Sequence, residues 1–141
     1  MTRGSVPHGT VIRYPYLWKW QDKRGETEGR KERPCCMVYS FTDPKTGQTH
    51  LFLLAISSQP PRADQGALEV PDLERRRAGL ADWKDAWITV SEYNHDIAEA
   101  SWYYDANAAP LGRFSDPFVR TVAAALRSAV VGRTARVDRT R

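Results

Sequence analysis

The chain has 141 residues, enough for one domain and too few for two ordinary ones, so we expect a single domain over residues 1–141. Hydrophobic residues make up 41% and charged residues 27% of the sequence, which excludes an intrinsically disordered chain, and no uncharged apolar run approaches the ~20 residues that span a bilayer. The formal net charge is +4, and residues 127–141 hold five arginines and one aspartate, so the excess charge lies at the C-terminal end.

The N-terminal part is expected to be a loose leader, residues 1–8, followed by a strand. From Thr10 to Trp20 large apolar side chains alternate with other residues, which is typical of a strand, and Pro15 favours a sheet edge or a bulge. Residues 21–32 are polar and contain two glycines, so we expect an exposed loop there. The leader has no apolar segment of the signal-peptide kind, which favours a cytoplasmic protein without a membrane partner.

The clearest predicted hairpin pairs residues 34–41 with residues 49–57 through a turn at 43–47 that contains Pro and Gly. Cys35 and Cys36 are neighbours on the first of these strands and point to opposite faces, so we expect two reduced packing residues. The three histidines, at positions 8, 50 and 95, have the spacing of neither a zinc site nor a catalytic pair. We expect no metal site, and we expect His50 to be exposed near the turn.

The second half of the chain is predicted to hold short elements and one clear helix. A helix that begins at Ser115 or Asp116 and ends before Gly132 has an apolar stripe at helical spacing. Residues 132–141 are expected to be flexible, as a phosphate-binding arm or a solubilising terminus. The preceding elements are a loop over 59–70, one or two helical turns over 72–78, a strand over 87–93 and a short strand over 102–104. This pattern favours a mainly β fold with a C-terminal α-helix, built as a small, partly open antiparallel barrel.

The hairpin register brings an arginine toward a hydroxyl group. With the turn centred near Lys45, cross-strand partners have residue numbers that sum to about 90, so Met37 faces Leu53 and Phe41 faces Thr49. Arg33 then lies beside Ser57 where both strands end, whereas a slip of one residue would place Ser58 opposite Arg33 and turn one strand's side chains over.

An arginine beside a hydroxyl at an open strand end can bind a phosphate, because the guanidinium fork matches two phosphate oxygens. Arg30 and Lys31 add cations, and a nearby carboxylate could serve as a general base on a ribose hydroxyl. Trp18 and Trp20 lie near this loop in sequence and are candidates for stacking on RNA bases, or are ordinary core residues. The other interpretation of the whole region is a surface ion-pair loop that precedes a strand.

Four stretches of the sequence resemble the PemK/MazF-like toxins, the endoribonuclease half of type II toxin–antitoxin pairs. Residues 28–34 (EGRKERP) resemble that family's glutamate, small loop and Arg-Pro entry to a strand. Residues 55–59 (AISSQ) resemble a strand end that carries Thr or Ser. Tyr16-Leu17-Trp18 is similar to the PemK-like branch of stand-alone growth inhibitors. The stretches are residues 9–12 (GTVI), 28–34 (EGRKERP), 55–59 (AISSQ) and 112–115 (GRFS), the last followed by the helix.

The resemblance implies an SH3-like barrel, a homodimer, a cognate antitoxin, and cleavage of single-stranded RNA that needs no metal or cofactor and leaves a cyclic phosphate. By position, Arg33 matches the catalytic arginine, Ser57 the catalytic hydroxyl and Glu28 the auxiliary acid. The chain has Ser where many members have Thr, and its acidic loop is long, so Glu26 or Glu32 could replace Glu28. Fold does not fix function, so a catalytically silent barrel that binds a protein or nucleic acid, or a topoisomerase poison, remains an alternative.

Overall fold

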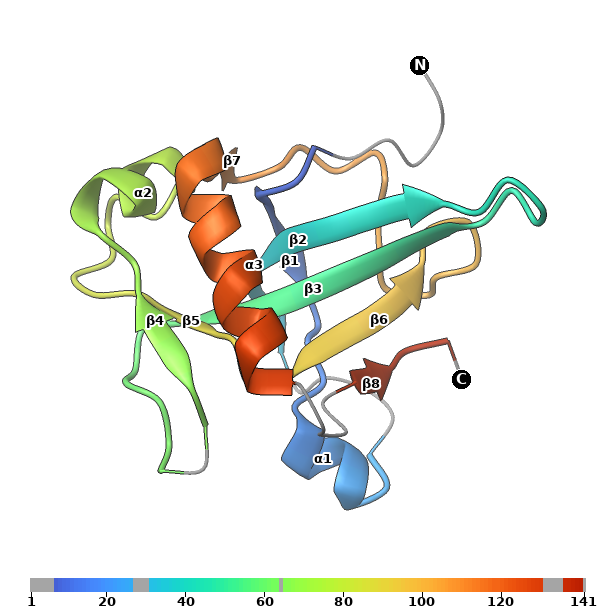
Figure 1. Cartoon of the computed structure of the whole chain (residues 1–141), viewed down its shortest axis with the longest axis horizontal. Coiled ribbons are helices and arrows are strands. Elements are labelled where there is room, and N and C mark those ends of the chain that lie inside the picture. The colour runs from blue at the N-terminus through green and yellow to red at the C-terminus, as the bar shows by residue number, and fades with distance from the viewer. Residues whose placement is uncertain (1–6, 27–30, 64, 131–135, 141) are drawn as a thin grey trace.

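The computed structural model describes residues 7–26, 31–63, 65–130 and 136–140. Within these residues the fold is one mainly antiparallel, open sheet with a long helix near the C-terminus (Figure 1). The strands are β1 (Thr10–Tyr14), β2 (Arg33–Thr42), β3 (Thr49–Ser57), β4 (Ala67–Glu69), β5 (Trp87–Thr89), β6 (Tyr93–Ile97), β7 (Gly112–Arg113) and β8 (Arg136–Asp138), and the helices are α1 (Lys19–Lys23), α2 (Asp72–Arg77) and α3 (Asp116–Val130).

Strand β3 organises the sheet because it has neighbours along both edges. The main path of the sheet runs β4-β5-β3-β2-β1-β7. On the edge away from β2, residues 50–53 of β3 pair with β6, whereas Ile56 and Ser57 pair with β5. The sheet therefore divides after Ala55, and the end of β3 that carries Ser57 turns toward β5 and β4.

The β2–β3 hairpin is confirmed, but its predicted register is correct only up to a bulge at Val38 and is shifted by one residue between the bulge and the turn. Met37 lies opposite Leu53, as predicted, but Tyr39 lies opposite Phe52, so Val38 is an extra residue. Beyond this bulge Phe41 faces His50 and not Thr49. A β-bulge inserts one extra residue into one strand and changes the direction of the side chains that follow it. A register counted from the turn assumes a regular pairing and so misses this extra residue.

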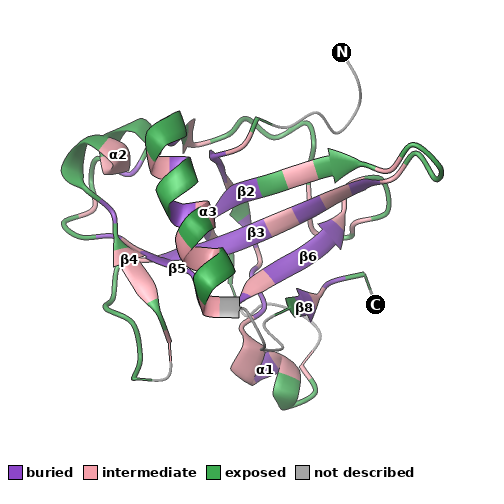
Figure 2. Cartoon of the chain, viewed as in Figure 1, coloured by how far each residue is buried: buried purple, intermediate pink, exposed green. Residues whose placement is uncertain are grey.

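Two apolar clusters cover the two faces of the sheet. One cluster joins Val38, Leu54 and Ile56 to Val119 and Val122 of α3, which crosses in front of β2 and β3 (Figure 1). The other, on the opposite face, contains Met37, Leu51 and Leu53, and Tyr14, Tyr16 and Trp18 pack into it. The central strands are accordingly the most buried part of the chain (Figure 2).

Several element predictions hold and others need correction. Helix α2 and the C-terminal helix are confirmed, and Ser115 Oγ accepts a hydrogen bond from the Phe118 amide as an N-cap at 3.4 Å. The strand predicted from Thr10 to Trp20 ends at Tyr14, just before Pro15. Helix α1 includes the first residues of the predicted loop over 21–32, and its Gln21 is buried. The strand predicted over 87–93 is two strands, β5 and β6, and residues 102–104 form no strand.

The prediction of a flexible C-terminal tail is wrong for residues 136–140. Strand β8 pairs with β6 in parallel, and its Val137 is fully buried. Arg139 is only 3% exposed: its guanidinium donates to the Pro15 carbonyl at 2.6 Å and lies 4.0 Å from the Tyr103 ring centroid. Residues 136–140, which hold Arg136 and Arg139, are therefore part of the packed structure.

The cysteine prediction is confirmed. Cys35 and Cys36 are both free and buried, one in each apolar cluster. Burial raises the pKa of both thiols, that of Cys36 to about 12, so both stay protonated at neutral pH. Among the described helices, none has the length and apolar character that a bilayer span requires.

Candidate active site

Arg33 and Ser57 line one groove, as the register argument predicts. The β2–β3 ladder pairs Cys35 with Ala55, two residues from each of them, so the two side chains lie on the same sheet face. The groove has a volume of about 590 Å³, and we call it the basic groove because Arg13, Lys31 and Arg33 line it. It also contains Glu32, Ser58, Gln59, Asp82 and Trp83.

Arg33 is half-buried and only partly satisfied. Its guanidinium carbon lies 5.1 Å from the centroid of the Trp18 ring, a cation–π contact that holds the side chain in one orientation. Its Nε is buried and has no hydrogen-bond partner among the described residues. The planar fork of donors at the guanidinium end matches the oxygens of an anionic ligand, so Arg33 can bind a phosphate in this groove.

Ser57 lies where two grooves meet. Its Oγ accepts a hydrogen bond from the Gln59 amide at 3.0 Å, which leaves the hydroxyl proton to donate elsewhere. Ser57 and Gln59 line the basic groove and also a second hollow of about 200 Å³, which we call the tryptophan groove. The tryptophan groove is lined by Trp18, Trp20, Trp87, Pro60, Pro61 and Arg62, among others.

Two buried polar side chains, Asn94 on β6 and Glu92 just before it, hold the segment that carries Trp18. Asn94 is fully buried and brackets Leu17: its Oδ1 accepts from the Leu17 amide at 2.9 Å and its Nδ2 donates to the Leu17 carbonyl at 2.7 Å. Glu92 Oε2 accepts from the Lys19 amide at 2.8 Å and from the Tyr16 hydroxyl at 3.2 Å. These bonds fix the start of α1 and so place Trp18 against Arg33.

The other predicted site residues divide into three groups. Lys31 and Ser58 are exposed and line the basic groove, and so does Glu32, one of the three candidate acids. Glu26 is half-buried, with its amide bonded to the Gln21 carbonyl, and does not line that groove. Glu28 and Arg30 lie outside the described residues.

Sequence reasoning missed the far wall of the basic groove. Asp82 and Trp83 come from the connection between α2 and β5 and face the ends of β2 and β3 across the groove. Asp82 gives the groove a second carboxylate beside Glu32. No motif marks a residue that reaches a site through a connecting loop, so the sequence contained no signal for either.

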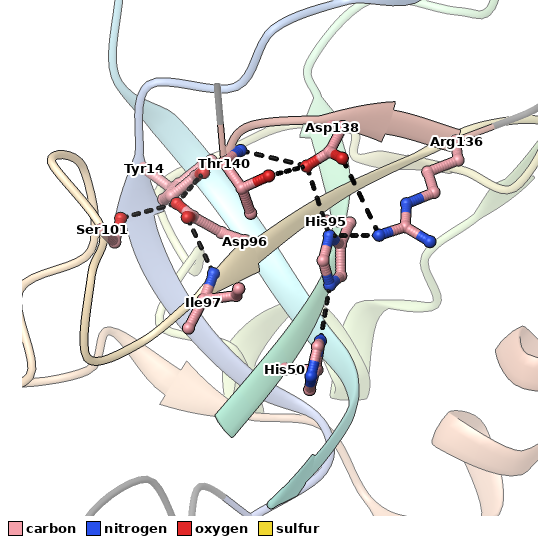
Figure 3. A network of polar contacts seen from close by, with 9 residues as sticks. All are labelled: Tyr14, His50, His95, Asp96, Ile97, Ser101, Arg136, Asp138 and Thr140. Carbon is pink, nitrogen blue, oxygen red and sulfur yellow. Dashed lines mark hydrogen bonds and ion pairs between the residues drawn. The ribbon is translucent and has the colours of Figure 1, made fainter. Parts of the chain in front are cut away.

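The structure also corrects the interpretation of the histidines. His50 Nδ1 lies 2.8 Å from His95 Nε2, although 45 residues separate them. They are diagonal neighbours on β3 and β6, since Phe52 pairs with His95 and His50 with Ile97. On the other side of the ring, His95 Nδ1 lies 2.7 Å from an Arg136 nitrogen and 3.4 Å from Asp138 Oδ1 (Figure 3).

The pKa of His95 is lowered, by burial first and then by the charge of Arg136, against the opposing effects of Asp138. The folded protein thus binds the His95 proton less readily than the unfolded chain, whose histidine pKa is about 6.5. We expect a stabilising contribution that is complete above pH ~6.5 and is lost as pH falls through the lower folded pKa. Denaturant unfolding at pH 7.5 and 5.5 measures this contribution.

The matched comparison is His95→Gln against His8→Gln. The wild type and His8→Gln should lose stability between pH 7.5 and 5.5, whereas His95→Gln should lose measurably less, whatever its stability at pH 7.5. Parallel losses in all three proteins would contradict this role of His95.

A scan against protein-family models finds no match for this chain, and a search of curated proteins finds no similar sequence. The geometry of the site consists of a guanidinium and a hydroxyl that line one groove, two carboxylates in the same groove, and a groove of tryptophan rings beside them.

Proposed function

We propose that the protein is an endoribonuclease that cleaves single-stranded RNA in the basic groove by attack of a ribose 2′-OH on the adjacent phosphate. The observation that carries the proposal is the convergence of Arg33 and Ser57 on one groove. The tryptophan groove supports it, because unpaired bases stack on aromatic rings and Ser57 borders both hollows.

In this mechanism the scissile phosphate binds to Arg33. Negative charge grows on the phosphoryl oxygens as the 2′-oxygen attacks, and the guanidinium and the Ser57 hydroxyl stabilise it as fixed donors. The 2′-OH loses its proton to a carboxylate, for which Glu32 and Asp82 are the described candidates and Glu28 the one implied by resemblance. The 2′-oxygen bonds to phosphorus as the bond from phosphorus to the 5′-oxygen breaks. The 5′-oxygen takes a proton from water and leaves as a hydroxyl, and the product ends in a 2′,3′-cyclic phosphate.

The resemblance to PemK/MazF-like toxins extends the proposal to fold family and partners. The open β sheet with a C-terminal helix is consistent with an SH3-like barrel of that family. A cytoplasmic homodimer and a cognate antitoxin that covers the groove then follow. The neighbouring reading frame is the place to look for that antitoxin.

Ser57 offers a conservative test of the mechanism. Ser57→Ala removes one donor to the phosphoryl oxygens and should lower the rate of RNA cleavage about 10²-fold. Ser57→Thr keeps the hydroxyl and should retain most of the activity. The measurement is the initial rate on a labelled RNA, with Ser128→Ala on the exposed side of α3 as the control. Equal rates for wild type and Ser57→Ala would exclude Ser57 from the chemistry.

Incubation of the purified protein with a long single-stranded RNA in EDTA separates the proposed function from its alternative. Discrete cuts support the ribonuclease. Retention of intact RNA on the protein supports the catalytically silent barrel instead, and no cutting by a folded protein with any single-stranded RNA contradicts the proposal.

A further inference from the structure

A row of aromatic rings lies on the outer face of the sheet, beside α3 and away from the basic groove. We call the rings of Tyr39, Phe41, His50 and Phe52 the aromatic shelf. Phe41 stacks on His50 with 4.9 Å between ring centroids and 13° between planes, and Tyr39 lies 5.8 Å from Phe52. Tyr39 and Phe41 are 49% and 42% exposed, so the shelf presents ring surface to solvent.

The bulge at Val38 creates this shelf. In a regular strand Tyr39 and Phe41 would share the face of Cys35 and Met37, which belong to the buried cluster on the other side of the sheet. The bulge moves both rings to the face of His50 and Phe52. Because the bulge leaves both of these large rings exposed, their role is more readily explained by binding than by packing.

Cations surround the shelf. A groove of about 590 Å³ runs between it and α3, lined by Tyr39, Phe52 and Tyr93 on the sheet and by Arg120 and Arg127 on the helix. No carboxylate lines this groove among the residues that the structure describes. Arg136 of β8 pairs with Tyr93 and adds a third guanidinium at the edge of the sheet.

The His50–His95 network holds Arg136 in place (Figure 3). Arginine only donates, so the 2.7 Å contact makes His95 Nδ1 an acceptor, and Nε2 then carries the proton that His50 Nδ1 accepts. Asp138 Oδ2 lies 3.9 Å from the same Arg136 nitrogen, and the Arg136 side chain is still 48% exposed. The buried His95 ring thus links His50 of the aromatic shelf to the guanidinium of Arg136.

We propose that the aromatic shelf is a binding site for single-stranded RNA, with bases stacked on Tyr39 and Phe41 and the phosphate backbone held by Arg120, Arg127 and Arg136. Aromatic rings beside guanidinium groups are the elements with which proteins bind single strands without pairing their bases. A second copy of the chain fits this face less well, because a two-fold interface would bring the same cations of both copies together. The choice of RNA rests on the proposed function; the stacking surface itself does not.

Fluorescence anisotropy tests the proposal with a labelled, unstructured 12-nucleotide RNA in EDTA. All proteins carry Arg33→Ala, so that the probe stays intact. Phe41→Ala or Tyr39→Ala should weaken binding about 5- to 100-fold. The control is Trp102→Ala, which removes a ring that is 92% exposed outside the shelf, and it should leave the affinity unchanged.

A salt titration tests the cations separately. Arg127→Gln and Arg136→Gln should each reduce the slope of log affinity against log salt by about 0.7, whereas Arg76→Gln, exposed on α2, should not change it. The same affinity and slope in shelf variants and controls would overturn the proposal. So would a shelf variant that converts a dimer to a monomer by sedimentation, because the face would then be an interface between copies.

These outcomes are distinct from failure of the proposed ribonuclease. If the protein cuts RNA but shelf variants bind normally, only the shelf proposal fails. If it never cuts RNA but the shelf variants lose binding, the shelf stands and the basic groove needs another explanation.

Discussion

Replacing Arg33 by alanine should lower the rate of RNA cleavage at least about 10²- to 10³-fold while the protein remains folded. The large effect is expected because the guanidinium supplies the main positive charge at the phosphate. Stability should change little, because the substitution also removes a buried Nε that has no hydrogen-bond partner among the described residues. The measurement is the initial cleavage rate in EDTA, with thermal unfolding of the same samples.

Two further variants define the role of this side chain. Arg33→Lys keeps a positive charge but loses the planar fork, so its activity should lie between those of wild type and Arg33→Ala. Arg76→Ala removes an exposed arginine of α2 and should be fully active. Wild-type cleavage by folded Arg33→Ala would remove the basic groove from the mechanism.

The largest effect on stability is expected at Arg139. Arg139→Ala removes the donor to the Pro15 carbonyl, a contact of 3.3 Å to Asn94 Oδ1, and the cation over the Tyr14 and Tyr103 rings. It leaves the partly buried Pro15 carbonyl with one bond fewer and a space between packed rings. We expect the free energy of unfolding to fall by about 2–4 kcal/mol, measured by denaturant titration.

The control for Arg139 is Arg120→Ala, an exposed arginine on α3, which should change the free energy of unfolding by less than about 0.5 kcal/mol. If both variants are equally stable, the C-terminal strand does not contribute to the fold as its burial indicates.

Local patterns predicted the central hairpin because its turn, its apolar strands and its two ends are close in sequence. The placement of Arg33 and Ser57 along one groove followed from that register, and the bulge did not change it because the bulge lies nearer the turn. The same bulge moved Phe41 from Thr49 to His50, since the run of apolar residues shows no sign of an extra residue.

Contacts between distant segments could not be predicted in this way. His50 meets His95 because β6 pairs with β3, and Arg139 is buried because β8 pairs with β6, and neither pairing has a local signal. A short basic stretch was interpreted as a flexible tail because composition alone does not show that Asn94 and two tyrosines form a site for one arginine. Asp82 and Trp83 could not be predicted either, because they reach the basic groove through a connecting loop that has no local signal.

The central claim is that Arg33 and Ser57 bind a phosphate which the neighbouring 2′-hydroxyl attacks. The most direct measurement compares a short RNA that contains a mapped cut with the same RNA carrying a single 2′-deoxyribose immediately before that phosphate. We predict that the all-ribose strand is cut in EDTA to give a 2′,3′-cyclic phosphate and that the substituted strand stays intact. Cleavage of the substituted strand at the same position and rate would contradict the account.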